Sequence, residues 1–292
     1  MAPHFAARGV STIILRERLR VDGYDMTVDA MRDVFQAIRL VRQRAGEWGL
    51  DPSKIGIAGF SAGGELSTAA AIEYPAFGTS AAFVAERGGS GEQLEGVPCR
   101  PDFSLSLYPG PSVFETVEGR KLFGASRLHG LDDLCLTEAL PVPPAVPVDA
   151  PPCFLASAGA GDQRGAFWAT QFFTALLLAG APNLEMHVYG EGSHGGGDII
   201  YPERSKGLPF ATWHLRFFEW MGSLGFLDPP GTSTKAAADL AEFASQTAAK
   251  EEAAEYSDEW VAAKKMAADK HAAYRDEVIP GERDGSGGEK QS

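Results

Sequence analysis

The feature that most constrains this sequence is a glycine-rich turn carrying a serine between an apolar run and a helix-compatible segment. Residues 59–64 read Gly-Phe-Ser-Ala-Gly-Gly, and the apolar run before them occupies residues 54–59. A serine on so tight a strand-to-helix turn takes strained backbone angles, and its neighbours must be small for the chain to reverse. The hydroxyl then projects at a helix N-terminus, where the helix dipole favours developing negative charge. The turn predicts a nucleophilic Ser61; a structural Gly-rich turn with a solvated serine is the alternative.

Strand-like and helix-like segments alternate along the chain without hairpin signals. We expect strands at 10–15, 54–59, 103–108, 151–158 and 184–189, and helices at 27–48, 65–74, 166–178 and 210–224. This alternation predicts the α/β class, with a mainly parallel sheet and helices on both of its faces. Functional sites of such sheets lie just past the carboxyl ends of the strands.

Two further glycine-containing loops hold the partners that a serine nucleophile needs. A base must take the serine proton, and a carboxylate must orient that base. His194 follows the last strand, and Asp162 follows the strand at 151–158, so the order is serine, acid, histidine, as in the α/β-hydrolase arrangement. We expect the backbone N–H of Ala62 to form half of an oxyanion hole. The competing acids and histidines are Asp149, Glu191, Asp198, His129, His187, His214 and His271.

Composition narrows the possible partners. The net charge of −13 argues against nucleic acid or an anionic membrane surface. No stretch reaches eighteen uninterrupted apolar residues and the N-terminus does not read as a signal peptide, so the chain as written is expected to be cytoplasmic. Cys99, Cys135 and Cys153 fit neither a disulfide framework nor a metal knuckle and read as core or loop residues. We expect no metal and no organic cofactor.

Residues 5–227 resemble the α/β-hydrolase esterases, specifically acetyl xylan esterases and related carbohydrate or feruloyl-type esterases. The match is carried by the turn at 59–64 together with Gly23-Tyr24, Asp29-Ala30, residues 37–42 and 48–52, Ile55-Gly56, Pro151-Pro152, Asp162 and Gly192 to Gly195. The resemblance implies an α/β-hydrolase fold and hydrolysis of a small carboxylic ester, on a sugar or polysaccharide, through an acyl-enzyme. It also implies a triad of Ser61, Asp162 and His194. A serine peptidase of the same fold and a non-catalytic, hydrolase-like interaction protein are the alternatives.

Members of this group usually carry a His/Pro-Gly-Gly-Gly loop, with the strands around it, before the point where this chain begins. That loop supplies the second oxyanion donor, and each such donor contributes about 10²–10³ in rate. In this chain, Met1 falls only a few residues before the helix that follows that loop. We therefore expect either a truncated start, which leaves secretion open, or a member with poor or no activity.

The composition changes after residue 228, and we place a domain boundary there: an esterase-like domain at 1–228 and an extension at 229–292. Residues 234–278 are rich in Ala, Glu, Lys and Asp with few large apolar residues, which favours helix without a second core. We expect one or two marginal helices and a disordered end at 281–292. A solvated extension and a protein-contact role are both open.

Overall fold

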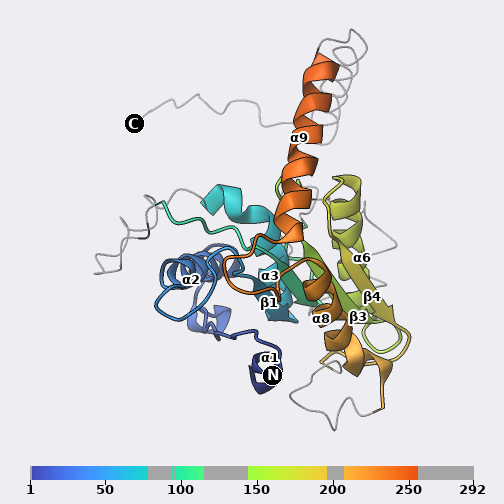
Figure 1. Cartoon of the computed structure of the whole chain (residues 1–292). Helices are drawn as coiled ribbons and strands as arrows, with labels where there is room; N and C mark the ends of the chain where they lie inside the picture. The colour runs from blue at the N-terminus through green and yellow to red at the C-terminus, as the bar shows by residue number, and fades with distance from the viewer. Residues whose placement is uncertain (1, 78–93, 95, 115–143, 196–206, 256–292) are drawn as a thin grey trace, which may run out of the picture. The chain divides into compact units, whose positions relative to one another are not determined.

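A computed structural model describes residues 2–77, 94, 96–114, 144–195 and 207–255, with side chains up to residue 250 (Figure 1). The chain divides into two compact units, Met1–Phe243 and Ala244–Ser292, so the division falls later than the boundary expected at 228. Helix α9 (Lys235–Glu255) spans the division and lies within the stretch where we expect helix. Cys135, His129, Asp198, His271 and the end at 281–292 lie outside the described residues.

The first unit contains a parallel sheet. Its described strands are β1 (Ile57–Phe60), β2 (Ser104–Leu107), β3 (Cys153–Ala158) and β4 (Glu185–Tyr189). They lie side by side in that order, and all three pairings are parallel. Phe60 pairs with Leu107, and Leu107 with Ala156, so the carboxyl ends of β1, β2 and β3 meet at one edge of the sheet. The predicted parallel α/β architecture is confirmed.

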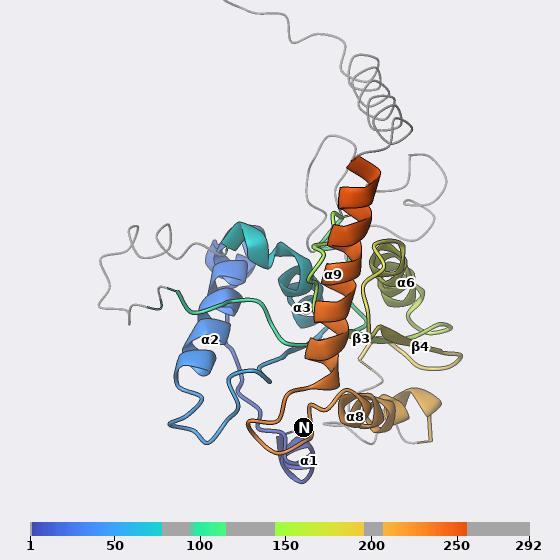
Figure 2. The ribbon, with the colours of Figure 1, turned by 45° about the horizontal axis from the view of Figure 1, so that its top comes forward.

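Helices cover both faces of the sheet, as expected (Figure 1, Figure 2). One face packs against α2 (Met31–Gln43), α3 (Ala62–Glu73) and α6 (Gln163–Leu178); the other packs against α1 (Ala2–Ala6) and α8 (Trp213–Ser223). Strand β3 contributes to both cores, with Cys153 and Leu155 on one face and Phe154 and Ala156 on the other. A strand buried on both faces reads as a continuous apolar run, which is why residues 151–158 were recognisable.

Helix α3 lies close to the sheet because the residues between them are small. A Cβ at Gly64 would lie 2.8 Å from the carbonyl oxygen of Leu107. Deeper in the interface, the Ser67 hydroxyl lies 2.9 Å from that of Ser104 and donates to the carbonyl of Leu105 at 2.9 Å. Because these buried hydroxyls need partners, they fix how α3 sits on β2. The turn that carries Ser61 begins this helix and is positioned with it.

The strand expected at 10–15 is wrong. The structure has no strand at these residues, and Ile13 and Ile14 are 55% and 89% exposed. β-Branched residues favour a strand, yet a strand also needs a neighbour for its backbone groups. Within the sheet that the structure describes, β1 pairs with β2 alone and with no strand from residues 10–15.

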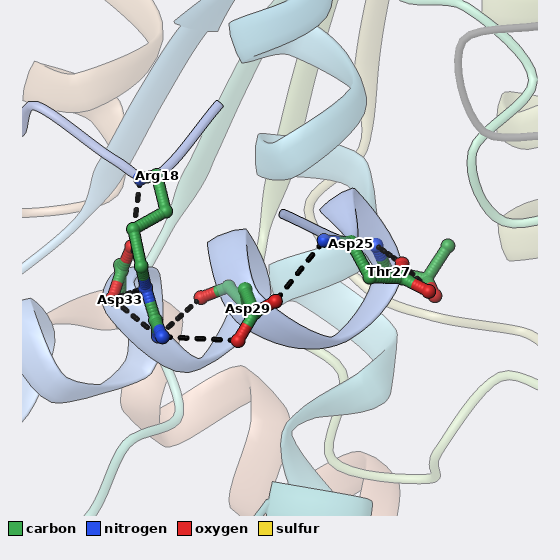
Figure 3. Close-up of polar contacts among 5 residues, drawn as sticks. All are labelled: Arg18, Asp25, Thr27, Asp29 and Asp33. Atoms are coloured by element: carbon green, nitrogen blue, oxygen red, sulfur yellow. Dashed lines mark hydrogen bonds and ion pairs between the residues drawn. The ribbon is translucent and has the colours of Figure 1, made fainter. Parts of the chain in front are cut away.

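Arg18 joins the segment before the next helices to those helices (Figure 3). Its Nε donates to both carboxylate oxygens of Asp33 at 3.0 Å, and its Nη1 donates to Asp29 at 2.9 Å. The backbone N–H of Arg18 also donates to Asp33, at 2.8 Å. Asp29 accepts a further bond from the backbone of Asp25, whose carboxylate accepts from the N–H and hydroxyl of Thr27. Hydrogen bonding to Asp33 raises the pKa of Arg18, so the guanidinium remains charged.

The helix expected at 27–48 is confirmed from residue 27 to residue 43 but ends earlier than expected. A helical turn, η2 (Met26–Ala30), leads into α2, which ends at Gln43. Arg39 of α2 is only 1% exposed and donates to the carbonyls of Val97 and Phe77 at 3.1 and 2.6 Å. These acceptors come from segments distant in sequence, so the pattern of α2 alone could not reveal them. Among the helices of the described ranges, none combines the length and apolarity needed to cross a membrane.

Candidate active site

Ser61 occupies the turn between β1 and α3 in the strained conformation that the sequence predicts. Its φ is 56° and its ψ is −118°, a region that costs a non-glycine residue about 1–3 kcal/mol. Its backbone N–H donates to the carbonyl of Leu107 at 3.1 Å, which ties the turn to β2. A Cβ at Gly59 would lie 1.8 Å from the carbonyl oxygen of Gly63, so the turn needs glycine there. Ala62, the expected oxyanion donor, is the first residue of α3 and is exposed.

The loop after β3 carries Asp162 and is called the acid loop; the loop after β4 carries His194 and is called the histidine loop. The two loops continue side by side past the ends of their strands. Gly159 donates to the carbonyl of Tyr189 at 2.7 Å, and Ala160 donates to that of Gly190 at 3.1 Å. Beyond these bonds the backbones come closer still, because a Cβ at Gly161 would lie 1.7 Å from the carbonyl oxygen of Gly192. The parallel pairing of β3 and β4 therefore brings the acid loop and the histidine loop together.

The three predicted catalytic residues form one chain of contacts. Ser61 Oγ lies 2.7 Å from His194 Nε2, and His194 Nδ1 lies 2.9 Å from Asp162 Oδ2. The Asp162 side chain is 7% exposed, and its other oxygen accepts from the N–H of Gly165 at 3.2 Å, at the N-cap of α6. The positive end of the helix dipole thus faces the carboxylate. His194 is 53% exposed, so its imidazole is open to an incoming molecule.

The competing residues that the structure describes have other contacts. His187 lies on β4 with its Nε2 2.8 Å from Glu185, and the ring of His214 packs against that of His4. Asp149 accepts from the hydroxyl of Tyr74, while Glu191 is exposed in the histidine loop. Within the described ranges, the hydrogen bond of the Ser61 hydroxyl goes to His194, which in turn contacts Asp162.

Cys99 and Cys153 are buried free thiols, as expected for core residues. Burial raises the pKa of Cys153 to about 12 and that of Cys99 above its usual range, so both remain protonated near neutral pH. Within the described ranges, no group of three or more His, Cys, Asp or Glu side chains could hold a metal ion.

One residue of the site was missed from the sequence. Tyr108 directly follows β2, and its ring packs against the imidazole of His194 with 4.9 Å between centroids in a T-shaped arrangement. The signal that could have identified it is position: it ends a buried strand at the same sheet edge as Ser61 and Asp162. Side-chain type alone gives no such signal, because a tyrosine at the end of an apolar strand is common in protein cores.

Comparisons with known proteins show which proteins this chain is similar to. A family model described as BD-FAE matches residues 10–86. An acetylxylan esterase from Xylanibacter ruminicola is 29% identical over 199 residues, which are 66% of this chain and 34% of the relative. The chain thus spans about a third of the length of this curated relative.

Solved structures resemble the chain over most of its length. An acetyl ester-xyloside bifunctional hydrolase from Caldicellulosiruptor lactoaceticus is 26% identical, with a TM-score of 0.57, over 77% of this chain and 75% of that one. The chain has the α/β-hydrolase fold. A thermophilic esterase from Thermogutta terrifontis, 20% identical with a TM-score of 0.55 over 79% of this chain and 76% of that one, shares the fold. A carboxylesterase from Lactobacillus plantarum does so at 19% identity and a TM-score of 0.55, over 77% and 78% of the two chains. The chain thus resembles an acetylxylan esterase in sequence and an acetyl ester-xyloside bifunctional hydrolase in fold, as expected.

Proposed function

We propose that this α/β-hydrolase is a serine esterase that removes a small acyl group, of the acetyl type, from a carbohydrate ester. The observation that carries the proposal is the unbroken contact chain from Ser61 through His194 to Asp162, at 2.7 and 2.9 Å. The likeness to an acetylxylan esterase and to an acetyl ester-xyloside hydrolase supports an acetylated sugar as the substrate class. We propose no cofactor, because acyl transfer to a serine needs only a base, an orienting acid and oxyanion donors.

Each residue has a defined role in the proposed reaction. Asp162 holds the proton on Nδ1 of His194, which leaves Nε2 free to accept the proton of Ser61 as Oγ attacks the ester carbonyl. The carbonyl oxygen becomes an oxyanion near the N-terminus of α3, where the N–H of Ala62 donates to it and the helix dipole favours its charge. His194 then returns the proton to the departing alcohol. Water, activated by the same imidazole, releases the acid from Ser61.

The proposal is tested with the full chain by hydrolysis of p-nitrophenyl acetate, release of acetate from acetylated xylan, and labelling by a fluorophosphonate followed by mass spectrometry. We expect label on Ser61, and a fall in turnover of at least about 10³-fold in Ser61→Ala. Ser193→Ala is the matched control, because this exposed serine lies in the histidine loop beside His194. A folded chain with no label on Ser61, and with the same turnover in Ser61→Ala, would refute the proposal. Turnover of an amide in place of the ester would assign the site to a peptidase.

A further inference from the structure

The strand order poses a geometric problem for the site. Ser61 follows β1, Asp162 follows β3 and His194 follows β4, with β2 between the serine and its two partners. The imidazole must therefore cross the carboxyl end of β2 to reach Ser61. The residue at that end is Tyr108, which is 4% exposed and whose N–H donates to the carbonyl of Ala156 at 2.9 Å. A side chain at this position can therefore support His194 from the side of the sheet.

Tyr108 and its neighbour contact the surroundings of all three residues. Leu107, one residue earlier, accepts the backbone N–H of Ser61. The Tyr108 ring packs against His194, with centroids 4.9 Å apart and planes at 64°. Its Cβ lies 3.0 Å from where a Cβ of Gly165 would stand, and Gly165 is the residue whose N–H holds Asp162. One short segment at the end of β2 thus lies between the nucleophile, the base and the acid.

The backbone of Tyr108 is held in an unfavourable conformation. Its φ is +38°, in the left-handed region that a bulky side chain rarely adopts. Such outliers persist where the surrounding structure overdetermines them, and they concentrate at functional sites. Here the surroundings are aromatic: Phe60 and Phe210 lie 6.2 and 5.9 Å from the Tyr108 ring, between centroids. These rings hold the tyrosine side chain against the imidazole.

We propose that Tyr108 is a positioning residue, whose ring holds the His194 imidazole between Ser61 and Asp162. A T-shaped contact between an aromatic ring and an imidazole is directional, so it restricts the rotation of His194 as well as its place. The restriction matters because His194 is half exposed and lies in a loop. The Asp162 carboxylate holds only the Nδ1 side of its ring. The inference rests on the proposed esterase function for its catalytic meaning, but the ring contact can be tested without turnover.

The test uses Tyr108→Leu and Tyr108→Met, which remove the ring, and Tyr108→Phe, which retains it. The first readout is the downfield proton resonance of the His194 Nδ1–H in its hydrogen bond to Asp162, assigned by its absence in His194→Gln. The second is the rate at which a fluorophosphonate labels Ser61. Phe103→Leu is the matched control, because Phe103 is buried in the same core cluster and directly precedes β2 at its other end.

We expect Tyr108→Leu and Tyr108→Met to lose the resonance to exchange with water and to be labelled about 10- to 100-fold more slowly. Tyr108→Phe and Phe103→Leu should keep the resonance and label within about threefold of the wild-type rate. The inference fails if a folded ring-free variant keeps both signals, or if Tyr108→Phe or Phe103→Leu loses as much as Tyr108→Leu. It also fails if neither ring-free variant folds, since Tyr108 would then serve the core. If the wild type is not labelled and Ser61→Ala turns over as fast as the wild type, the esterase proposal fails, and the resonance alone decides the positioning role.

Discussion

The contact between Gly161 and Gly192 gives the sharpest quantitative prediction, for the variant Gly161→Ala. The added Cβ would lie 1.7 Å from the carbonyl oxygen of Gly192, whereas ordinary van der Waals contact begins at 3.4 Å. The acid loop and the histidine loop must therefore part by about 1.7 Å, or distort by an equivalent amount. The hydrogen bond from His194 Nδ1 to Asp162, now 2.9 Å, would then exceed hydrogen-bonding distance.

A displacement of about 1 Å in a catalytic group can cost 10²-fold in rate. We therefore expect kcat/KM for p-nitrophenyl acetate to fall by about 100-fold in Gly161→Ala, equivalent to about 2.7 kcal/mol of transition-state stabilisation. The same variant should be labelled more slowly at Ser61 by a fluorophosphonate, because activation of the serine depends on His194.

Gly190→Ala is the matched control for this experiment. Gly190 lies in the same histidine loop, but a Cβ there would meet nothing within 4 Å. We expect its kcat/KM to stay within about twofold of wild type, with both variants showing cooperative thermal unfolding. Wild-type activity in Gly161→Ala, or an equal loss in Gly190→Ala, would refute the argument that close backbone contact aligns the acid and the base.

Two further predictions concern stability. Arg18→Gln leaves Asp29 and Asp33 without their shared cation. We therefore expect the free energy of unfolding, measured in urea, to fall by about 1–3 kcal/mol. Arg16 is an exposed neighbour, so Arg16→Gln is the control and should change this free energy little. Burial lowers the pKa of His214 below 6.5, so the unfolded chain binds more protons there and stability should fall as pH drops below about 6.5. His214→Phe should lose less stability between pH 7.5 and 5.5 than wild type; an equal loss would contradict this reasoning.

Much of the site could be predicted because each of its parts leaves a local signal. The turn at 59–64 requires small residues around a serine, and His194 and Asp162 both follow apolar strands in glycine-containing loops. The fold then brings these residues together, because the loops that follow parallel strands lie at one edge of the sheet. The positive φ of Ser61 and the close approach at Gly59 show why the turn at 59–64 needs small residues.

The expectations that failed concern contacts between distant segments. The β-branched run at 10–15 satisfies the composition of a strand, but pairing depends on which backbone lies beside it, and composition does not encode that. The burial of Arg39 depends on the carbonyls of Phe77 and Val97, which accept its hydrogen bonds and lie far from α2 in the sequence. Tyr108 was missed for a related reason: its place beneath His194 follows from the order of β1 to β4, which the sequence left open.

These contacts separate the determinants of stability from those of the site. Arg18 binds carboxylates of η2 and α2, whereas Ser61, Asp162 and His194 lie in loops that follow β1, β3 and β4. Gly161 and Gly192, in contrast, lie within two residues of the acid and the histidine and touch through their backbones. Loss of the Arg18 contacts should therefore weaken the fold while leaving the geometry of the remaining folded molecules intact. A bulkier residue at 161 should do the reverse, because the helices and strands that form the cores can stay packed while the two loops separate.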